Sequence, residues 1–111
     1  MKLLHHPAKD EIALPTVLHA LSDPVRLQIV AQIHKNGEQA CKNFEVSIAK
    51  STLSQHARTL REAGITHTRA VGTHRLLSLR TEDLNARFPG LLDAVLSSYK
   101  SNTNPVRQTT L

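Results

Sequence analysis

Cysteine is almost absent from this chain of 111 residues, in which Cys41 is the single thiol. One cysteine excludes an intrachain disulfide framework, and it excludes the zinc sites and iron–sulfur clusters that several cysteines hold. The sequence also lacks a Gly-rich phosphate loop and the pattern of a catalytic triad. Because the chain is also unusually small for an enzyme, we expect a protein without catalytic activity.

Aromatic residues are equally scarce, at 3% of the composition, and tryptophan is missing. A core of Leu, Ile, Val and Ala suits helices packed on helices, and the length fits one compact domain. No apolar run approaches the roughly 20 residues that a membrane span needs. The N-terminal stretch MKLLHHPAKDE is too short and too polar for a signal peptide. We therefore expect a cytoplasmic protein with no membrane contact.

Positive charge is in excess, with 14 Lys and Arg against 9 Asp and Glu. Residues 42–80 hold two anions, Glu45 and Glu62, and seven cations, which are Lys42, Lys50, Arg58, Arg61, Arg69, Arg75 and Arg80. This window therefore carries the whole net charge of +5. Such a one-sided excess is typical of proteins that bind polyanions, and an ordinary solvated basic surface is the alternative interpretation.

Apolar spacing predicts two helices in the first third of the chain, over residues 12–21 and 24–35. The residue before the second helix, Asp23, is expected to cap its free N–H groups. Pro24 takes the first helical position, where its fixed φ already suits a helix. Asn36-Gly37 is expected to end this helix through a left-handed cap.

The period of the sequence changes in the middle of the chain. Residues 38–49 show no clear period and could form a short helix of one or two turns. A helical pattern returns over residues 51–63. Residues 65–71 and 74–80 are rich in β-branched and apolar residues around a central Gly-Thr, which predicts a tight β-hairpin.

A last helix is predicted over residues 81–99, with Pro89-Gly90 as a kink or a break. We expect residues 1–11 to form an N-terminal arm, residues 12–99 to form one domain, and residues 100–111 to form a flexible tail. The order of these elements is helix, helix, short helix, helix, hairpin and helix. This order predicts a winged helix-turn-helix, a mainly α fold with a small β-hairpin.

The segment 50–65, KSTLSQHARTLREAGI, has the composition of a helix that reads DNA. A recognition helix presents short polar groups from its first turns to base edges, while its back packs on the scaffold. The predicted DNA contacts are Lys50, Ser51, Thr52, Ser54, Gln55 and His56, with Arg58 and Arg61 suited to phosphates. An amphipathic surface helix is the alternative, but serine is a weak helix former and an unusual choice for a purely structural helix.

The predicted hairpin carries cations and polar residues on both strands near its turn, namely Arg69, Thr73, His74 and Arg75. A protruding basic hairpin can follow the minor groove or the backbone beside a helix in the major groove. A hairpin that only covers the core is the alternative. The cations on both strands favour a DNA-binding wing.

Three stretches together resemble the arsenic-repressor (ArsR/SmtB) family of bacterial transcription factors: ALSDPVRLQIV (20–30), STLSQHARTLREAGI (51–65) and GTHRLLSLR (72–80). The similarity extends over about residues 12–98. It implies a homodimer through residues of about 12–21 and 84–99, with the 51–63 helices in successive major grooves of a near-palindromic operator. It also implies repression that ends when a metal ion or another inducer binds.

The sequence departs from the metal sites of that family. A paired-cysteine site needs two thiols, and a last-helix zinc site needs histidine, which residues 81–99 lack. The remaining candidate ligands are His5, His6 and Cys41, which could form a tetrahedral nitrogen and sulfur set, within one chain or across a dimer. Cys41 could instead act as a redox switch, and an organic ligand, a partner protein or no effector are further alternatives. We expect no cofactor to be needed for folding, and a metal effector stays an open question.

A sequence-specific DNA-binding repressor is thus the main hypothesis from the sequence. The alternative is a winged-helix module that binds protein or RNA partners without promoter specificity. The base-edge residues within 51–56 argue against that alternative.

Overall fold

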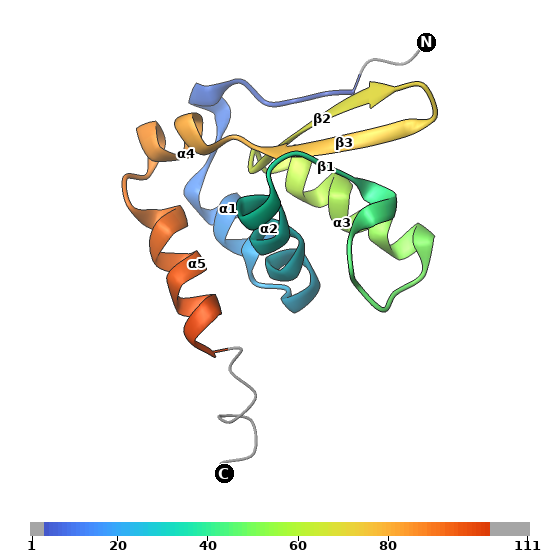
Figure 1. Cartoon of the computed structure of the whole chain (residues 1–111). Coiled ribbons are helices and arrows are strands. Elements are labelled where there is room, and N and C mark those ends of the chain that lie inside the picture. Colours follow the sequence, from blue (N-terminus) through green and yellow to red (C-terminus); the bar gives the residue numbers. More distant parts are fainter. Residues whose placement is uncertain (1–3, 103–111) are drawn as a thin grey trace.

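The computed structural model describes residues 4–102 of the chain (Figure 1). The helices are α1 (Leu14–Leu21), α2 (Pro24–Asn36), α3 (Lys50–Glu62), α4 (Thr81–Arg87) and α5 (Leu91–Asn102). The strands are β1 (Gln39–Ala40), β2 (Thr66–Val71) and β3 (His74–Leu79), and short 3-10 turns cover Lys9–Glu11 and Cys41–Asn43. This order confirms the predicted winged helix-turn-helix.

The start of α2 forms as the sequence predicts. One carboxylate oxygen of Asp23 accepts hydrogen bonds from the backbone N–H groups of Val25 and Arg26, at 2.8 and 3.1 Å, and Pro24 is the first helical residue. At the other end Gly37 has φ of 83° and ψ of −164°. The positive φ confirms why glycine is needed, but this ψ lies outside the left-handed helical region, so the predicted left-handed cap is wrong in that detail.

The predicted short helix within 38–49 is confirmed only as one turn of 3-10 helix, at Cys41–Asn43. Gln39 and Ala40 instead form β1, which pairs antiparallel with β3 opposite Leu77 and Leu76. A single 3-10 turn and an extended loop follow, and the buried ring of Phe44 fixes this loop to the core. A two-residue strand is too short to produce a period in the sequence, and its hydrogen-bonding partner lies far along the chain.

The predicted hairpin and the break in the last helix are both confirmed. β2 and β3 pair from Thr66 opposite Leu79 to Val71 opposite His74, with Gly72 in the turn at φ of 61°. Pro89-Gly90 separates α4 from α5. Helix α5 continues to Asn102, and the rest of the predicted tail 100–111 lies outside the described residues. The boundaries of the predicted arm, domain and tail stay predictions.

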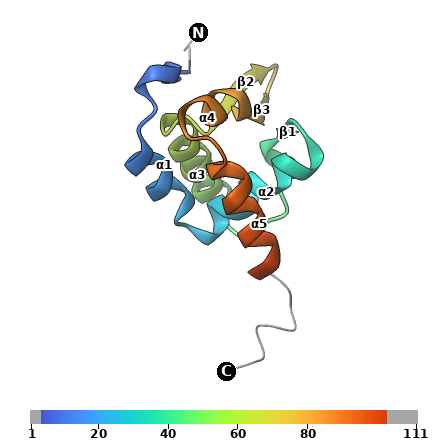
Figure 2. The same ribbon diagram turned by 90° about the vertical axis from the view of Figure 1, so that its left-hand side faces the viewer.

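The core lies where α1, α2, α3 and β3 meet, and its fully buried side chains include Ile29, Val30, Leu60, Ile65 and Leu77. The hairpin runs above α3 in Figure 1, and its tip lies at the opposite end of the molecule from α4 and α5. Figure 2 looks at the side on which α4 and α5 lie. No helix within residues 4–102 is long and apolar enough to cross a membrane.

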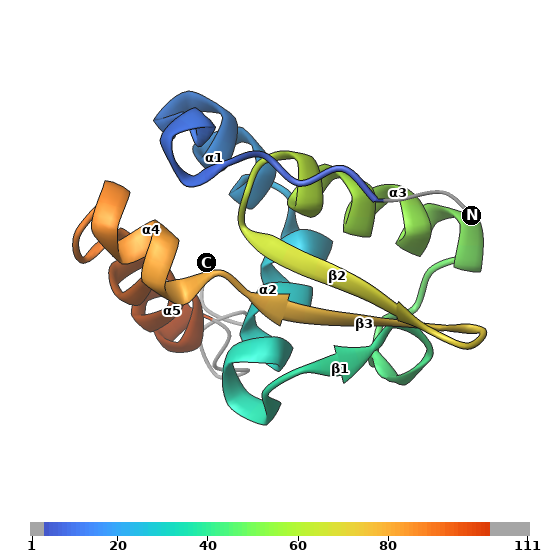
Figure 3. The same ribbon diagram turned by 90° about the horizontal axis from the view of Figure 1, so that it is seen from above.

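The N-terminal segment is fixed against the hairpin, and Figure 3 shows it passing beside β2. The backbone N–H of Thr68 donates to Nε2 of His6 at 3.0 Å, and the His6 ring stacks on His67 at 4.3 Å between centroids. Arg61 and Arg80 donate to the carbonyl oxygens of His5 and Pro7. Residues 5–7 therefore behave as part of the folded unit.

Candidate nucleic-acid interface

Helix α3 has one face on the core and another toward solvent. Ala57 and Leu60 are buried, and Leu53 packs against the core cluster beside them. Lys50, Ser51, Ser54, Gln55 and Arg58 are exposed, whereas Thr52, His56 and Arg61 are half-buried. The polar residues of the predicted recognition helix are thus mostly accessible, as contacts with base edges and phosphates require.

His56 is held by the scaffold on one of its two ring nitrogens. Its Nδ1 lies 3.2 Å from the Arg26 guanidinium, which also donates to the carbonyl oxygens of Ala20 and His19 at 2.6 and 3.3 Å. Arginine has only donors, so Nδ1 accepts, and the neutral ring carries its proton on Nε2. His56 therefore has a fixed orientation, with one N–H left to donate.

Two arginines of the predicted site, Arg58 and Arg61, already have partners within the protein. Arg58 forms an exposed ion pair with Glu62 one turn later, at 3.0 Å. Arg61 donates from Nε to the carbonyl oxygen of His5 at 3.1 Å, so the N-terminal segment restricts its side chain. Both arginines remain at the surface, but neither is a freely rotating cation.

One basic residue of the hairpin, Arg69, is paired with a carboxylate, whereas those at its tip are not paired within residues 4–102. Arg69 donates two hydrogen bonds to the Glu38 carboxylate, and this pairing lowers the pKa of Glu38 below its usual value. Thr73, His74 and Arg75 are exposed at and beside the turn. The accessible positive charge of the wing is therefore at its tip.

Only part of the basic window is free of carboxylate partners. Arg58, Arg69 and Arg80 form ion pairs with Glu62, Glu38 and Asp83. Within residues 4–102, the cations of the window without an ion pair are Lys42, Lys50, Arg61 and Arg75. Glu38 and Asp83 lie outside the 42–80 window, which explains why the charge count alone did not reveal two of these pairs.

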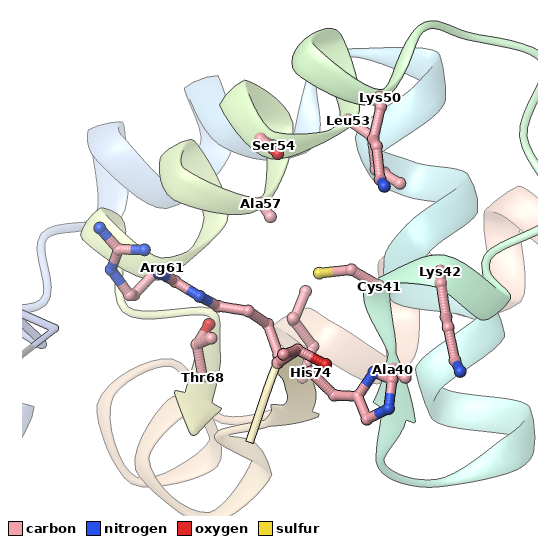
Figure 4. Close-up of a pocket in the computed structure, with 13 residues that line it drawn as sticks. Ala40, Cys41, Lys42, Lys50, Leu53, Ser54, Ala57, Arg61, Thr68 and His74 are labelled. Atoms are coloured by element: carbon pink, nitrogen blue, oxygen red, sulfur yellow. The ribbon is translucent and has the colours of Figure 1, made fainter. Parts of the chain in front are cut away.

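The four unpaired cations line one groove of about 620 Å³ between α3 and the hairpin. Lys50 and Arg61 border it from α3, and Lys42 lies on the other side (Figure 4). Arg75 lines the groove from β3. Among residues 4–102, no carboxylate belongs to its lining. The fold therefore brings the free cations of the basic window to a single concave surface.

The candidate metal ligands are not brought together. His6 stacks on His67 beside β2, and burial, followed by the nearby charges of His67 and Arg61, lowers its pKa. Cys41, in contrast, lines the groove between α3 and the hairpin. In the part of the chain that the structure describes, no three His, Cys, Asp or Glu side chains are grouped as a metal site would require. Any site made of His5, His6 and Cys41 would need a second subunit.

The predicted redox role of Cys41 lacks the electrostatics it would require. Burial raises the pKa of the Cys41 thiol, and the nearby positive charge of Arg75 opposes this only in part. A reactive cysteine needs a lowered pKa, because the thiolate is the nucleophile. Lys42 is the next residue in the sequence and could in principle favour a thiolate, but the shift of the Cys41 pKa has the opposite direction.

One groove residue was missed by the sequence analysis. Thr68 on β2 is 5% exposed, and its hydroxyl oxygen has no hydrogen-bond partner among the described residues. The alternation of Thr and charged residues in THTR was visible in the sequence, but it indicates only which side chains face inward. That the hydroxyl lies at a groove rather than in a closed core is a tertiary property.

A second, apolar groove lies between α1, the start of α2 and α5. A groove of about 630 Å³ there is lined mainly by apolar residues, including Leu18, Leu27, Val95 and Tyr99. Leu18 is 46% exposed. Other residues of the predicted dimer segments, such as Leu92, are buried within the chain itself. Exposed apolar area of this kind is typical of surfaces that bind another protein.

Comparison with known proteins gives a consistent set of relatives. The chain is 35% identical over 82 residues to YceK of Bacillus subtilis (strain 168), an uncharacterised HTH-type transcriptional regulator, and the match covers 71% of this chain and 82% of YceK. No protein-family model matches the sequence.

Solved structures show the same architecture. The transcriptional repressor BigR from Xylella fastidiosa is 31% identical, with a TM-score of 0.56 over 68% of this chain and 85% of BigR. A possible transcriptional regulator for arsenical resistance is 26% identical, with a TM-score of 0.57 over 83% of this chain and 99% of that protein. An ArsR family transcriptional regulator shares the fold at 14% identity and a TM-score of 0.56, over 96% of this chain and 100% of that protein.

Proposed function

Because the chain belongs to the ArsR/SmtB family of winged helix-turn-helix transcriptional regulators, we propose that it is a homodimeric, sequence-specific repressor. It binds a near-palindromic operator through α3 and the β2–β3 wing, and it leaves the operator when an effector binds. The observation that carries this proposal is the arrangement of Lys50 and Arg75 on opposite walls of one groove without carboxylates.

The two parts of the interface have different tasks. Ser51, Thr52, Ser54, Gln55 and the free N–H of His56 reach base edges in the major groove, where hydroxyl, amide and imidazole groups can distinguish bases. Lys50, Arg58, Arg61 and Arg75 contact phosphates, and Thr73 and His74 at the wing tip reach the adjacent minor groove. Arg69 belongs to the wing but is held by Glu38 in the free protein.

The second subunit binds across the apolar groove between α1 and α5. Leu18, Val95 and Tyr99 give this groove the exposed apolar area that a two-fold interface buries. A dimer places two α3 helices one helical turn apart along DNA, which matches operators with two-fold symmetry. Each subunit then brings the unpaired cations of the groove to the DNA. If each subunit neutralises about three phosphates, the slope of log K against log salt should be near −5.

Fluorescence anisotropy tests this proposal directly. A duplex taken from upstream of the protein's own gene should bind at least about ten-fold more tightly than a scrambled duplex at physiological salt. The Gln55→Ala variant should lose this preference, whereas Arg75→Ala should weaken binding to all duplexes alike. Equal losses on both duplexes for both variants would overturn the division between base and phosphate contacts, and equal weak binding of the unmodified protein would overturn sequence-specific repression.

A further inference from the structure

The groove between α3 and the hairpin has the size and lining of a small-molecule site. Its volume of about 620 Å³ falls within the range of roughly 300–1,000 Å³ that is typical of ligand pockets. The cations Lys50 and Arg75 lie on its walls, and Leu53, Ala57 and Leu77 supply an apolar surface. A lining of this kind suits a ligand that has an anionic group on an apolar body.

Thr68 marks the place where the anionic group would bind. Its hydroxyl oxygen is buried and has no hydrogen-bond partner within residues 4–102, and Figure 4 shows the oxygen turned toward the cavity. The backbone N–H of Thr68 is already used by His6. Buried hydroxyls are nearly always satisfied, because an unmade hydrogen bond is costly. This free donor lies in a groove that already holds cations, and a ligand oxygen would satisfy it.

The register of the hairpin places Arg75 and Leu77 beside Thr68. Leu77 lies directly opposite Thr68, and Arg75 lies opposite Ala70, two residues further along the same face of β2. Side chains two apart on a strand share a face, and diagonal neighbours across a strand pair are within reach of long side chains. The Arg75 guanidinium can therefore reach an anionic group that accepts from the Thr68 hydroxyl.

The part of the groove wall that Cys41 forms carries no negative charge that would repel an anion. Figure 4 shows the sulfur of Cys41 pointing into the groove. Burial raises the pKa of this thiol, so it stays uncharged at neutral pH and does not repel an anion. A neutral thiol is a small, polarisable, largely apolar surface, which suits the body of an organic ligand.

We propose that this groove binds a small organic anion, whose anionic group lies between the Thr68 hydroxyl and Arg75 and whose apolar body lies against Leu77 and Cys41. A DNA phosphate is part of a continuous backbone, so it can meet Lys50 and Arg75 without entering the groove, whereas a small anion can enter it and approach Thr68. A bound anion would neutralise cations that the proposed operator complex needs. The effect on DNA rests on the proposed function, whereas binding of the anion does not.

Binding is tested with naphthalene-2-sulfonate as the probe and neutral naphthalene-2-sulfonamide as its matched control. Each is titrated into full-length protein at physiological salt while two-dimensional amide NMR spectra are recorded. The sulfonate should shift the amides of Thr68 and Cys41 at one site per chain, and the sulfonamide should bind at least about ten-fold more weakly. Equal binding of the two compounds, or shifts confined to α1 and α5, would overturn the site.

Variants distinguish the loss of a specific contact with the Thr68 hydroxyl from a general effect on folding. Thr68→Val keeps the shape of the side chain and should lower affinity for the sulfonate about ten-fold. Thr66→Val is the matched control, because the Thr66 hydroxyl is equally buried and unpartnered but does not line the groove. Arg75→Gln should weaken binding, whereas Arg58→Gln, outside the groove, should not. Equal affinities of the Thr68 and Thr66 variants would overturn the proposed contact.

A competition experiment tests the regulatory half of the proposal, which is that binding of the anion releases DNA. The sulfonate should release the operator duplex from the unmodified protein but not from Thr68→Val, which retains the cations that meet DNA. If the sulfonate binds at Thr68 without releasing DNA, the regulatory half is wrong. If no duplex binds at all, the proposed repressor function fails while the anion site stands. If DNA binds specifically and the Thr68 amide does not respond to the sulfonate, the anion site fails and the repressor function stands.

Discussion

The guanidinium group of Arg69 on β2 donates two hydrogen bonds to the Glu38 carboxylate just before β1, at 2.9 and 2.8 Å. The pair joins two segments that are 31 residues apart in the chain. It holds the loop before β1 against the wing, and it neutralises a cation that the sequence assigns to DNA binding. Arg69 is thus a wing residue whose charge is compensated by the Glu38 carboxylate.

This pairing predicts an unusual gain of affinity. Glu38→Gln should tighten binding to all duplexes, because it removes an anion and leaves Arg69 free to meet a phosphate. The slope of log K against log salt should become steeper by about one per subunit. Anisotropy titrations at several salt concentrations measure both quantities. Glu82→Gln removes the same charge from exposed α4, and a gain as large in that control would show that only net charge matters.

The histidine at the N-terminal segment predicts a pH dependence of stability. The pKa of His6 is lowered, first by burial and then by His67 and Arg61, and its Nε2 must be unprotonated to accept from Thr68. The unfolded chain therefore binds the proton more readily than the folded one. The contribution of His6 should be complete above the unfolded pKa of about 6.5 and should fall as the pH drops from there through the lower folded pKa.

Urea unfolding at pH 7.5 and at pH 5.5 measures this effect, with His6→Ala as the variant. The free energy of unfolding of the unmodified protein should decrease more between the two pH values than that of His6→Ala. His5→Ala serves as the control, because His5 contributes only its backbone carbonyl to Arg61. A His5 variant with the same reduced pH dependence would contradict the role of His6.

Gly64 at the end of α3 predicts a large loss of stability on substitution. Its φ is +86°, and a Cβ built there would lie 2.6 Å from Cγ1 of the buried Ile12. Gly64→Ala should lower the free energy of unfolding by about 2–4 kcal/mol, from backbone strain and overpacking together. Chemical denaturation followed by circular dichroism measures the loss.

Gly72 provides the matched control for that variant. Its φ is also positive, at +61°, but no atom of the described part of the chain lies within 4 Å of an added Cβ. Gly72→Ala should therefore cost only the backbone term, about 1–2 kcal/mol. In a double-mutant cycle, Gly64→Ala should cost less in an Ile12→Ala background than in the unmodified protein, by the steric part of the loss. If both glycine variants lose the same stability, the contact with Ile12 is not the cause.

The apolar groove between α1 and α5 predicts the effect of a charge on association. Leu18→Glu should convert the proposed dimer into a monomer, because a carboxylate would be buried against Val95 and Tyr99 of an apolar surface. Size-exclusion chromatography with light scattering at micromolar concentration measures the mass. Val71→Glu is the control, since Val71 is similarly exposed, at 44%, but lies at the wing. A monomeric unmodified protein would contradict the proposed interface.

Local signals in the sequence were enough for most of the fold. Asp23 and Pro24 predicted the start of α2, and Pro89-Gly90 predicted the break before α5, because a cap or a breaker acts on its immediate neighbours. Gly72 likewise predicted the hairpin turn, because the positive φ that the turn needs is a property of that residue. The two-residue β1 was missed, because its existence depends on β3 and not on its own residues.

The sequence by itself determined the main helices and the hairpin, the resemblance to the family, and the excess of positive charge in one window. The tertiary structure decided which of those charges are free, because Arg69 meets Glu38 from 31 residues away. It likewise decided that His56 is held by Arg26, 30 residues away, and that Thr68 has a buried hydroxyl without a partner among the residues that the structure describes. Composition fixes the number of charges and donors, whereas packing between distant segments fixes which of them are already satisfied. A ligand or a DNA phosphate can engage only those that are not.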